Sequence, residues 1–382
     1  MTKRLLTAGV VGTSRKENEH RLPIHPDHFE RVPAECRPAL RFETGYGRAF
    51  GVDEERLRAL SAGEPWPRQR LLAECEVVIL PKPLTEDLRD LREGGILWGW
   101  PHCVQQEEMT QAAIDQRQTL IAFEAMFQWS ASGQRGLHLF YKNNELAGYC
   151  AVLHALELEG LDGYYGKERS AVLLGFGSTS RGAAYSLQGR GIRDLTILTQ
   201  RPTHLVKDQL PGARYLQMRR TADGLEAVAA DGSHRPLLQL LAGADLVVNG
   251  TLQDTDRPLM FLREGEDRSL RPGCLIVDVS CDEGMGFPFA RPTSFESPTF
   301  KSGPATYYAV DHTPSYLWDA STWEVSEALL PYLECVLSGP DAWQQEPIIA
   351  RAIEIHDGTV SNDKILTFQN REDDYPHSIR SS

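Results

Sequence analysis

The sequence predicts an α/β fold made of two Rossmann-like, doubly wound parallel-sheet domains that flank a cleft and are joined by a long helix. Three observations lead to this prediction. Short apolar runs alternate with charged, helix-compatible segments, as in parallel sheets with helical crossovers. A glycine-rich turn at residues 175–182 directly follows one of these runs. The length of 382 residues suits about two domains.

The first part of the chain is expected to form a sheet with helical crossovers. Its apolar runs are short and are separated by charged segments whose composition is compatible with helices. The expected strands are Leu6–Gly12, Leu40–Thr44, Val77–Leu80, Ile96–Trp100 and Leu120–Phe123, and the expected helices include Asp53–Leu60 and Glu86–Arg92.

A proline-free helical stretch, Asn144–Leu158, is expected to link the two domains. The chain then alternates again, and after Pro314 it turns helical and is expected to pack back onto the first domain. The strands expected in this half are Ala171–Leu174, Leu195–Leu198, Leu246–Asn249, Leu275–Val279 and Tyr307–Val310, and the C-terminal helices are Trp323–Leu337 and Ile348–Ile355.

These elements define two domains. Residues 1–143 plus 314–382 are expected to form a substrate-binding and catalytic domain, and residues 144–313 a nucleotide-binding domain. The polar tail Arg371–Ser382 is expected to fray.

The glycine-rich turn has the strand–turn–helix layout of a dinucleotide-binding crossover. Gly175 permits the tight turn, and Gly177 lets the backbone approach a pyrophosphate at the N-terminus of the following helix. The third glycine of the G-x-G-x-x-G pattern is replaced by Ser180, which is small enough for close packing, and the next glycine is Gly182. The alternative is a tight turn without a ligand.

The tip of the second strand of this domain indicates which nucleotide binds. An NAD site usually carries Asp or Glu there, whereas this chain has Thr199-Gln200-Arg201. Arg201 can pair with a 2′-phosphate through two N–H groups, and Arg181 is a second candidate, so NADP is favoured over NAD. The alternative is two solvated arginines. The expected cofactor-binding residues are Gly175, Gly177, Ser178, Thr179, Ser180, Arg181, Gly182, Gln200, Arg201, Asn249 and Gly250.

Composition excludes several other classes of protein. A net charge of −13 argues against nonspecific binding to nucleic acid or anionic membranes. No apolar run approaches the ~18 residues of a membrane span. Seven scattered cysteines without a C-x-x-C pattern are typical of reduced thiols in the cytoplasm, and no metal site is expected. The C-terminal helices could form a face for a homo-oligomer.

Reactive side chains recur at the ends of the expected strands. Lys82 follows Val77–Leu80, His102 follows Ile96–Trp100, and Glu124 follows Leu120–Phe123. In the second domain, Asp278 and Asp282 follow another strand. Ligands of open α/β sheets bind beyond the carboxyl ends of strands, so these groups would converge on one cleft. Histidine and a desolvated lysine suit proton transfer near neutral pH.

Each of these residues also has a structural interpretation. Lys82 could be a solvated turn residue, His102 a structural histidine, Glu124 an ion-pair partner and Asp282 a helix N-cap. Arg21 and Arg135, the latter in a glycine-bounded loop, could each clamp a substrate carboxylate or lie solvated on the surface.

Several of these stretches resemble the alanine dehydrogenase, transhydrogenase and saccharopine dehydrogenase superfamily, in the same order along nearly the whole chain. The segments of this chain that resemble the superfamily are Ser14–Arg21, Pro81–Pro83, Pro101-His102 and Val277–Gly284. Two further phrases, Trp98–His102 and Val310–Trp318, are similar to a branch that joins a 2-oxo acid to an amino-acid side chain; alanine dehydrogenases have an asparagine-containing stretch instead.

The resemblance implies an NADPH-dependent reductive condensation of pyruvate, or another 2-oxo acid, with the side-chain amine of ornithine or lysine. It implies acid–base roles for Lys82 and His102 with Glu124 nearby, carboxylate binding by Arg21 and Arg135, and an active-site position for Asp282. Saccharopine formation and alanine dehydrogenation remain alternatives within the superfamily. A nucleotide-binding sensor or scaffold without turnover is the alternative of another class. The sequence does not distinguish the oxo acid or the amine.

Overall fold

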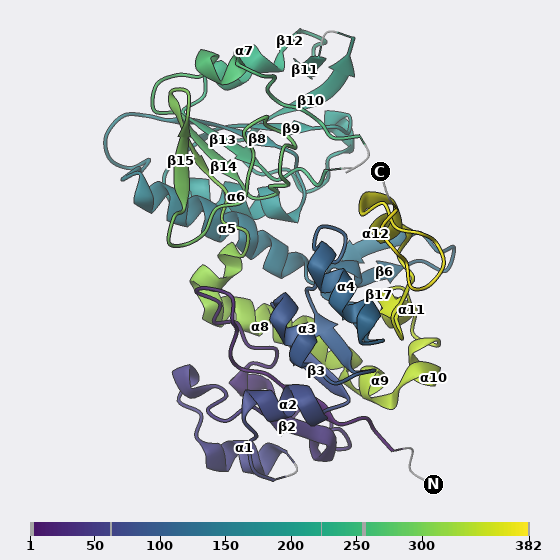
Figure 1. The fold of residues 1–382 in the computed structure, drawn as a ribbon. Helices are drawn as coiled ribbons and strands as arrows, with labels where there is room; N and C mark the ends of the chain where they lie inside the picture. Colours follow the sequence, from purple (N-terminus) through teal and green to yellow (C-terminus); the bar gives the residue numbers. More distant parts are fainter. Residues whose placement is uncertain (1–3, 62, 223, 254–256, 381–382) are drawn as a thin grey trace. The chain divides into compact units, whose positions relative to one another are not determined.

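The structure, a computed structural model, describes residues 4–61, 63–222, 224–253 and 257–380. The chain divides into two compact units (Figure 1). Unit 1 comprises residues 1–141 and 318–382, and unit 2 comprises residues 142–317. Unit 1 is therefore built from two separate stretches of chain, between which unit 2 is inserted.

Unit 1 contains a seven-stranded sheet in the order β18-β17-β5-β4-β3-β1-β2. The five strands from β5 to β2 are parallel, which confirms the parallel-rich α/β fold predicted for this part. The parallel strands are β1 (Ala8–Val10), β2 (Leu40–Phe42), β3 (Val77–Leu80), β4 (Ile96–Gly99) and β5 (Thr119–Ala122); β17 (Ile353–His356) and β18 (Thr359–Val360) are antiparallel, and β6 (Phe127–Trp129) pairs with β7 (Arg135–His138) in a separate hairpin.

Helices cover both faces of this sheet. One face packs against the first α-helix and most of the C-terminal helices, and the other packs against the remaining connecting helices and the last helix. Asp53 caps the first α-helix, because its side chain accepts a hydrogen bond from the N–H of Arg56. The helices are α1 (Glu54–Leu60), α2 (Arg68–Glu74), α3 (Thr85–Asp90), α4 (Glu107–Asp115), α8 (Trp318–Leu329), α9 (Leu333–Ser338), α10 (Pro340–Trp343), α11 (Pro347–Ala350) and α12 (Asp363–Phe368).

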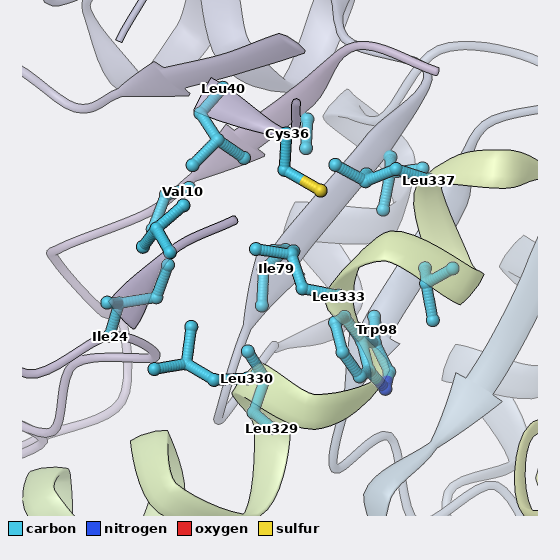
Figure 2. Packing of buried hydrophobic residues seen from close by; sticks show 14 of the residues in the cluster. Val10, Ile24, Cys36, Leu40, Ile79, Trp98, Leu329, Leu330, Leu333 and Leu337 are labelled. Carbon is cyan, nitrogen blue, oxygen red and sulfur yellow. The ribbon is translucent and has the colours of Figure 1, made fainter. Parts of the chain in front are cut away.

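Figure 2 shows the core beneath α8 and α9, where side chains from the first strands meet the C-terminal helices. The contributing residues lie far apart in the sequence, so the two stretches of unit 1 share one hydrophobic core. The labelled members are Val10, Ile24, Cys36, Leu40, Ile79, Trp98, Leu329, Leu330, Leu333 and Leu337.

Two expectations for the C-terminal region are wrong. The segment Ile348–Ile355 is not one helix: α11 ends at Ala350, and β17 follows and pairs with the edge strand β5. The described part of the tail, 371–380, does not fray. Arg371 is buried and donates hydrogen bonds to the side chains of Gln369 (2.6 Å) and Gln111 (2.7 Å).

Unit 2 contains a nine-stranded sheet in the order β12-β11-β10-β9-β8-β13-β14-β16-β15. Its six central strands are parallel and follow the 3-2-1-4-5-6 order of a Rossmann fold. The strands are β8 (Ser170–Leu174), β9 (Asp194–Thr199), β10 (Arg214–Thr221), β11 (Gly224–Val228), β12 (His234–Pro236), β13 (Leu246–Asn249), β14 (Leu275–Asp278), β15 (Thr299–Ser302) and β16 (Ala305–Tyr308).

The α-helices described in unit 2 are α5 (Tyr141–Leu158), which begins at the last residue of the first stretch of unit 1, α6 (Ser178–Gly189) and α7 (Leu237–Ala242). The α5 and α6 backbones approach each other closely at two glycines. A Cβ on Gly182 would lie 1.7 Å from the carbonyl oxygen of Glu145, and a Cβ on Gly148 would lie 1.8 Å from that of Thr179. Only glycine fits at these two positions, so the crossing of α5 and α6 depends on both.

Among the described residues, no helix has the length and apolar character needed to cross a membrane. In the same part of the chain, no three His, Cys, Asp or Glu side chains are grouped closely enough to hold a metal ion.

Candidate functional site

The carboxyl edge of the unit 1 sheet brings together side chains from several strands. The strand order changes direction at β1, which pairs with both β2 and β3, and such a switch point is where α/β sheets bind ligands. Beyond it, the Ser14 hydroxyl donates a hydrogen bond to the Lys82 carbonyl oxygen (3.1 Å). Lys82 is half-buried between two buried prolines, as expected for a lysine held at a strand end rather than freely solvated.

His102 and Glu124 lie in contact at the ends of the adjacent strands β4 and β5. The backbone N–H of His102 donates to Glu124 Oε1 (2.6 Å), and the ring Nδ1 lies 3.7 Å from the same oxygen. The His102 side chain is 41% exposed and can reach a ligand. Its backbone is left-handed (φ 49°), which costs energy for a residue other than glycine and is common at functional sites.

Burial and the charge of Glu354 together raise the pKa of Glu124 to about 8, while Lys82 opposes the shift. Its side chain remains 24% exposed, but the Oε2 atom is buried. Glu124 therefore holds a proton near neutral pH more readily than an ordinary glutamate does. This places a weakly acidic carboxyl directly beneath His102.

Arg21 is buried and held in a fixed orientation by Glu19. Its backbone N–H and its Nε both donate to Glu19 Oε1 (2.9 and 2.8 Å), and a terminal nitrogen reaches Oε2 (2.5 Å). The guanidinium also lies over the ring of Trp100, 5.2 Å from its centroid. A cation oriented in this way is suited to binding a carboxylate.

Arg135 was expected in a glycine-bounded loop, and this expectation is wrong because Arg135 lies in a strand. It is the first residue of β7 in the β6–β7 hairpin, exposed, with its guanidinium 4.8 Å from the centroid of Phe127. His138, at the other end of β7, was not among the predicted residues. Its Nε2–H donates to the Phe123 carbonyl oxygen (3.0 Å), and burial lowers the pKa of His138 to about 4.

A hollow of about 350 Å³ opens beside the ends of β1 and β2. Its lining carries both charges and hydrogen-bonding groups, which suits an amino acid or a 2-oxo acid. Part of this lining lies in Ser14–Arg21, a segment that resembles the superfamily, whereas the residues of the second loop, such as Arg48, belong to no recognisable motif. The polar lining residues include Thr13, Ser14, Lys16, Glu19, His20 and Arg48.

In unit 2, the glycine-rich loop lies at the switch point between β8 and β13. Gly175 has φ 90°, and a Cβ there would lie 2.9 Å from Thr251 Oγ1. Gly177 is exposed and precedes α6, and a Cβ there would meet nothing within 4 Å. Ser180 is buried against Gly250, where a Cβ would lie 2.3 Å from Ser180 Oγ.

These features fit the phosphates of a dinucleotide. The open side of Gly177 leaves room for a pyrophosphate at the N-terminus of α6, which begins with the half-buried Ser178 and Thr179. Within the described part of the chain, the hydroxyl oxygens of Ser180 and Thr251 are buried and have no hydrogen-bond partner. Gly182 has a separate role, because its missing side chain accommodates α5.

Arg181 and Arg201 both contact Phe176, inside the glycine-rich loop. The Arg181 guanidinium lies 4.6 Å from the ring centroid, and Arg201 donates to the Phe176 carbonyl oxygen (3.4 Å). Next to the exposed Gln200 is a hollow of about 520 Å³ whose lining includes Arg219 and Arg220 of β10. The sequence analysis missed these two arginines, since β10 was not recognised as a strand.

Buried polar groups support the ends of β13 and β14. Asn249 Nδ2 donates to Asp278 Oδ1 (2.8 Å), and the Tyr307 hydroxyl donates to Oδ2 (2.7 Å). Burial nevertheless raises the pKa of Asp278 to about 7. Asp282 lies in the turns that follow β14 and its carbonyl accepts from the N–H of Met285 (3.0 Å), so it does not cap a helix.

We expect Asp278 and Glu124 to make the protein lose stability as the pH rises from about 6.5 to above 8; below about 6.5 the lowered pKa of His138 acts in the opposite direction. The ordinary pKa values of Asp278 and Glu124 are 3.8 and 4.5, and folding raises them to about 7 and about 8. Between these limits the unfolded chain has released protons that the folded chain retains, so the free energy of unfolding falls with pH. Denaturant unfolding followed across this range measures the effect, and a rise in stability toward pH 8 would contradict it.

Residues 171–363 match the protein family described as "Alanine dehydrogenase/PNT, C-terminal domain". Among curated proteins, the chain is 24% identical over 370 residues to an alanine dehydrogenase of Mycobacterium tuberculosis, covering 94% of this chain and 95% of that protein. It is 27% identical over 380 residues to that of Geobacillus stearothermophilus (95% and 97%). An N(5)-(carboxyethyl)ornithine synthase of Clostridium botulinum is 23% identical over 326 residues (81% and 89%).

Solved structures share the fold. An L-alanine dehydrogenase superposes with a TM-score of 0.77 at 20% identity, covering 95% of this chain and 99% of that chain. A transhydrogenase from Sinorhizobium meliloti superposes with a TM-score of 0.68 at 15% identity, covering 93% and 99%.

Proposed function

Because the chain belongs to the alanine dehydrogenase/PNT family, we propose that it is a pyridine-nucleotide-dependent oxidoreductase that joins a 2-oxo acid to an amine. The observation that carries this proposal is the grouping of Lys82, His102 and Glu124 at the ends of three adjacent strands, with His102 in contact with Glu124. A sensor or scaffold without turnover would have no need for this group of ionisable side chains.

The reaction proposed first is the condensation of pyruvate with the side-chain amine of ornithine, or of lysine, to give an N-(1-carboxyethyl) amino acid. The amine nitrogen attacks the carbonyl carbon, water leaves, and an imine forms. NADPH, when bound, supplies the hydride that reduces the imine carbon. Atoms balance with one NADPH and one proton consumed and one water released for each product.

Acid–base groups are required because the side-chain amine is protonated at neutral pH and cannot attack in that form. His102 is proposed to accept that proton, and Lys82 to donate one to the departing hydroxyl. Arg21, fixed by Glu19, is proposed to bind the carboxylate of the oxo acid. When the Glu124 carboxyl is ionised, its negative charge stabilises the positive charge that develops at the imine nitrogen. Asp282 and the exposed Arg135 are proposed to contribute to substrate binding.

Alanine dehydrogenation, with ammonia as the amine, is the second candidate. It is supported by relatives named alanine dehydrogenase that match more than nine-tenths of this chain. The stretch after β16 argues against alanine dehydrogenation. There the side chains of Asp311 and His312 pair (2.5 Å), whereas the superfamily resemblance leads us to expect an asparagine at this place in alanine dehydrogenases.

A substrate panel distinguishes these candidates. Oxidation of NADPH is followed by absorbance with pyruvate or 2-oxoglutarate, each combined with ornithine, lysine or ammonia, and the product is identified by mass. We expect the highest kcat/KM with pyruvate and ornithine. Turnover of pyruvate with ammonia, but with neither ornithine nor lysine, would establish alanine dehydrogenation. Turnover of 2-oxoglutarate with lysine would establish saccharopine formation. No turnover with any pair would favour a sensor.

We further propose that the cofactor is NADP, because the tip of β9 carries Gln200 and Arg201 and no carboxylate. Replacing Arg201 by serine is expected to weaken NADPH binding ~10–100-fold and to leave NADH binding unchanged, since a charge-assisted hydrogen bond contributes ~1.5–3 kcal/mol. Fluorescence titration of each nucleotide measures the two dissociation constants.

The matched control is Arg214→Ser. Arg214 is an exposed arginine at the opposite end of the same sheet, where it pairs with Asp194 (3.3 Å). This control should leave both dissociation constants unchanged. Equal weakening of NADPH and NADH by Arg201→Ser would refute the assignment of Arg201 to the 2′-phosphate.

A further inference from the structure

Strand β10 extends beyond the end of its neighbour β9. The two strands are parallel, and their last paired residues are Gln217 of β10 and Thr199, where β9 ends. Met218–Thr221 therefore continue past the tip of β9 and pair with β11 on the other side. In a Rossmann fold the ribose of the adenosine lies at this tip. The free end of β10 is the next surface that a group on that ribose meets.

The hollow of about 520 Å³ beside Gln200 lies against this free end. Its volume falls within the ~300–1,000 Å³ range of small-molecule sites. Among the described residues that line it, three are arginines and none is acidic, although the chain has a net charge of −13. The arginines are Arg219, Arg220 and Arg257. The hollow therefore concentrates positive charge and suits an anion.

The rest of the lining is apolar or carries amide groups. Leu252 leaves 83% of its surface exposed, and a flat ring that covered it would remove apolar surface from water. Apolar surface next to arginines suits a ligand that combines a heteroaromatic base with a phosphate. The apolar lining residues are Met218, Leu225, Leu252 and Leu259, and the amides are Gln200, Gln217 and Gln253.

Hydrogen bonds fix both walls of the hollow. On the side of β10, Gln217 Nε2 donates to the Gln200 carbonyl oxygen (3.1 Å), which ties β10 to the segment after β9. On the side of the loop after β13, the Gln253 side chain accepts from the N–H of Leu259 (2.9 Å) and donates to its carbonyl oxygen (3.3 Å). The two walls therefore hold defined positions, and little ordering is needed when a ligand binds.

The two arginines of β10 make only modest contacts within the described part of the chain. Arg220 donates through one terminal nitrogen to the Pro258 carbonyl oxygen (3.1 Å). A terminal nitrogen of Arg219 lies 3.5 Å from Glu226 Oε2, on the residue directly opposite in β11. The Arg219 side chain is 55% exposed, and a pair this long and exposed contributes little. A phosphate with nearly two negative charges is a stronger partner for both guanidinium groups.

We propose that Arg219 and Arg220 bind the 2′-phosphate of NADP, and that the adenine ring lies on the apolar part of the same hollow. Arg201, which contacts the glycine-rich loop at Phe176, holds the same phosphate from the side of that loop. The inference rests on the proposed function in one respect, the choice of NADP as cofactor. It adds β10 as a second strand that distinguishes NADP from NAD.

The test uses adenosine fragments, whose binding requires neither substrate nor turnover. Binding of 2′,5′-ADP, 5′-AMP and inorganic phosphate to the full-length protein is measured by calorimetry near neutral pH. The wild type is expected to bind 2′,5′-ADP ~10–100-fold more tightly than 5′-AMP, because charge-assisted hydrogen bonds form only with the 2′-phosphate. Inorganic phosphate should bind more weakly than 2′,5′-ADP. Equal affinity for these two would show that the hollow takes free phosphate, and would overturn the assignment to the nucleotide.

Arginine variants locate the phosphate. Arg219→Ser and Arg220→Ser are each expected to weaken binding of 2′,5′-ADP ~10–100-fold and to leave 5′-AMP unchanged, which also shows that the nucleotide site is folded. The matched control is Arg235→Ser. Arg235 is exposed on β12 of the same sheet, outside the described lining of the hollow, and its replacement should alter neither constant.

Two results of these variants would overturn the proposal. One is unchanged binding of 2′,5′-ADP in both arginine variants, and the other is equal weakening of 2′,5′-ADP and 5′-AMP in Arg219→Ser. If Arg220→Ser does not fold because the contact with Pro258 is lost, Arg219→Ser alone must still remove most of the preference for 2′,5′-ADP.

Glu226→Gln tests the same site through a gain of affinity. Removing the carboxylate beside Arg219 is expected to strengthen binding of 2′,5′-ADP ~2–5-fold and to leave 5′-AMP unchanged, because the arginine loses a competing partner. In the Arg219→Ser background the same change should have a smaller effect. Unchanged or weaker binding of 2′,5′-ADP in Glu226→Gln alone would overturn the role of Arg219.

The outcomes separate this inference from the proposed function. If the wild type bound 2′,5′-ADP no more tightly than 5′-AMP, the choice of NADP and the inference would both be wrong. If the preference existed but only Arg201→Ser removed it, NADP would stand as the cofactor and the inference would fail. If the variants of β10 behaved as expected and no condensation occurred, the proposed reaction would be wrong and the inference would stand.

Discussion

Replacing His102 by glutamine is expected to lower kcat ~10²–10⁴-fold, the usual contribution of a general acid–base group. Glutamine has similar size and hydrogen-bonding capacity, but it cannot accept a proton from the amine substrate. The backbone N–H that donates to Glu124 remains, so the local structure should be retained. Single-turnover oxidation of NADPH with saturating pyruvate and ornithine measures the loss.

A matched variant shows whether the effect is specific to His102 or follows the replacement of any histidine in the same unit. His356 lies on β17 of the same unit, with 45% of its side chain exposed, beside Asp357. His356→Gln should leave kcat unchanged, and neither variant should alter NADPH binding. If turnover of His102→Gln stayed within about threefold of the wild type, the acid–base role of His102 would be wrong.

Gly182→Ala is expected to destabilise unit 2 by ~3 kcal/mol or more, or to prevent its folding. The added Cβ would lie 1.7 Å from the Glu145 carbonyl oxygen, which belongs to the backbone of α5 and cannot turn aside like a side chain. The helices would have to separate, and overpacking of this kind costs ~1–3 kcal/mol even where neighbours can adjust. Denaturant unfolding monitored by circular dichroism measures the change.

The opposite result is expected seven residues further along the same helix. A Cβ on Gly189 would meet nothing within 4 Å, so Gly189→Ala should leave stability unchanged or raise it by ~0.5–1 kcal/mol through the better helix propensity of alanine. Equal stability of the two variants would show that the crossing of α5 and α6 does not depend on Gly182.

The parallel strands were predictable because they are buried on both faces. Val77–Leu80 is a continuous apolar run, and Leu246–Asn249 is apolar up to its final asparagine. The structure has both as fully buried strands with these bounds. The segment Ile348–Ile355 was not predictable in this way. Its apolar residues fit a helix equally well, and β17 forms only because the edge of β5 offers it a partner.

One interior strand of unit 2 was missed because its composition is polar. β10 has the sequence Arg214–Thr221, in which polar residues dominate, and its pairing with both β9 and β11 stabilises a strand that its composition does not indicate. The arginines of the hollow beside Gln200 were missed with it. Gly182 was expected to bind the nucleotide, but a glycine is needed there because α5 crosses α6 at this point. A local sequence motif does not contain the position of that crossing.

The candidate site could be predicted where a reactive side chain directly follows an apolar strand. Lys82, His102 and Glu124 meet this criterion, because the carboxyl ends of parallel strands share one edge. Glu354 does not, since it lies on an antiparallel strand from the distant C-terminal stretch. The pairing of β17 with β5 brings this strand beside the edge strand that ends shortly before Glu124.

The insertion of unit 2 within unit 1 also constrains the order of biogenesis. During translation, the stretch that ends at Tyr141 leaves the ribosome with its core uncovered, since Leu329, Leu333 and Leu337 have not yet been made. Unit 2 is formed by one continuous stretch of chain, so it can fold before the rest of unit 1 has been synthesised. The residues proposed for acid–base chemistry lie in unit 1, which is completed only when β17 has been made. A nascent chain stalled before that strand would hold a folded unit 2 beside an unfinished unit 1.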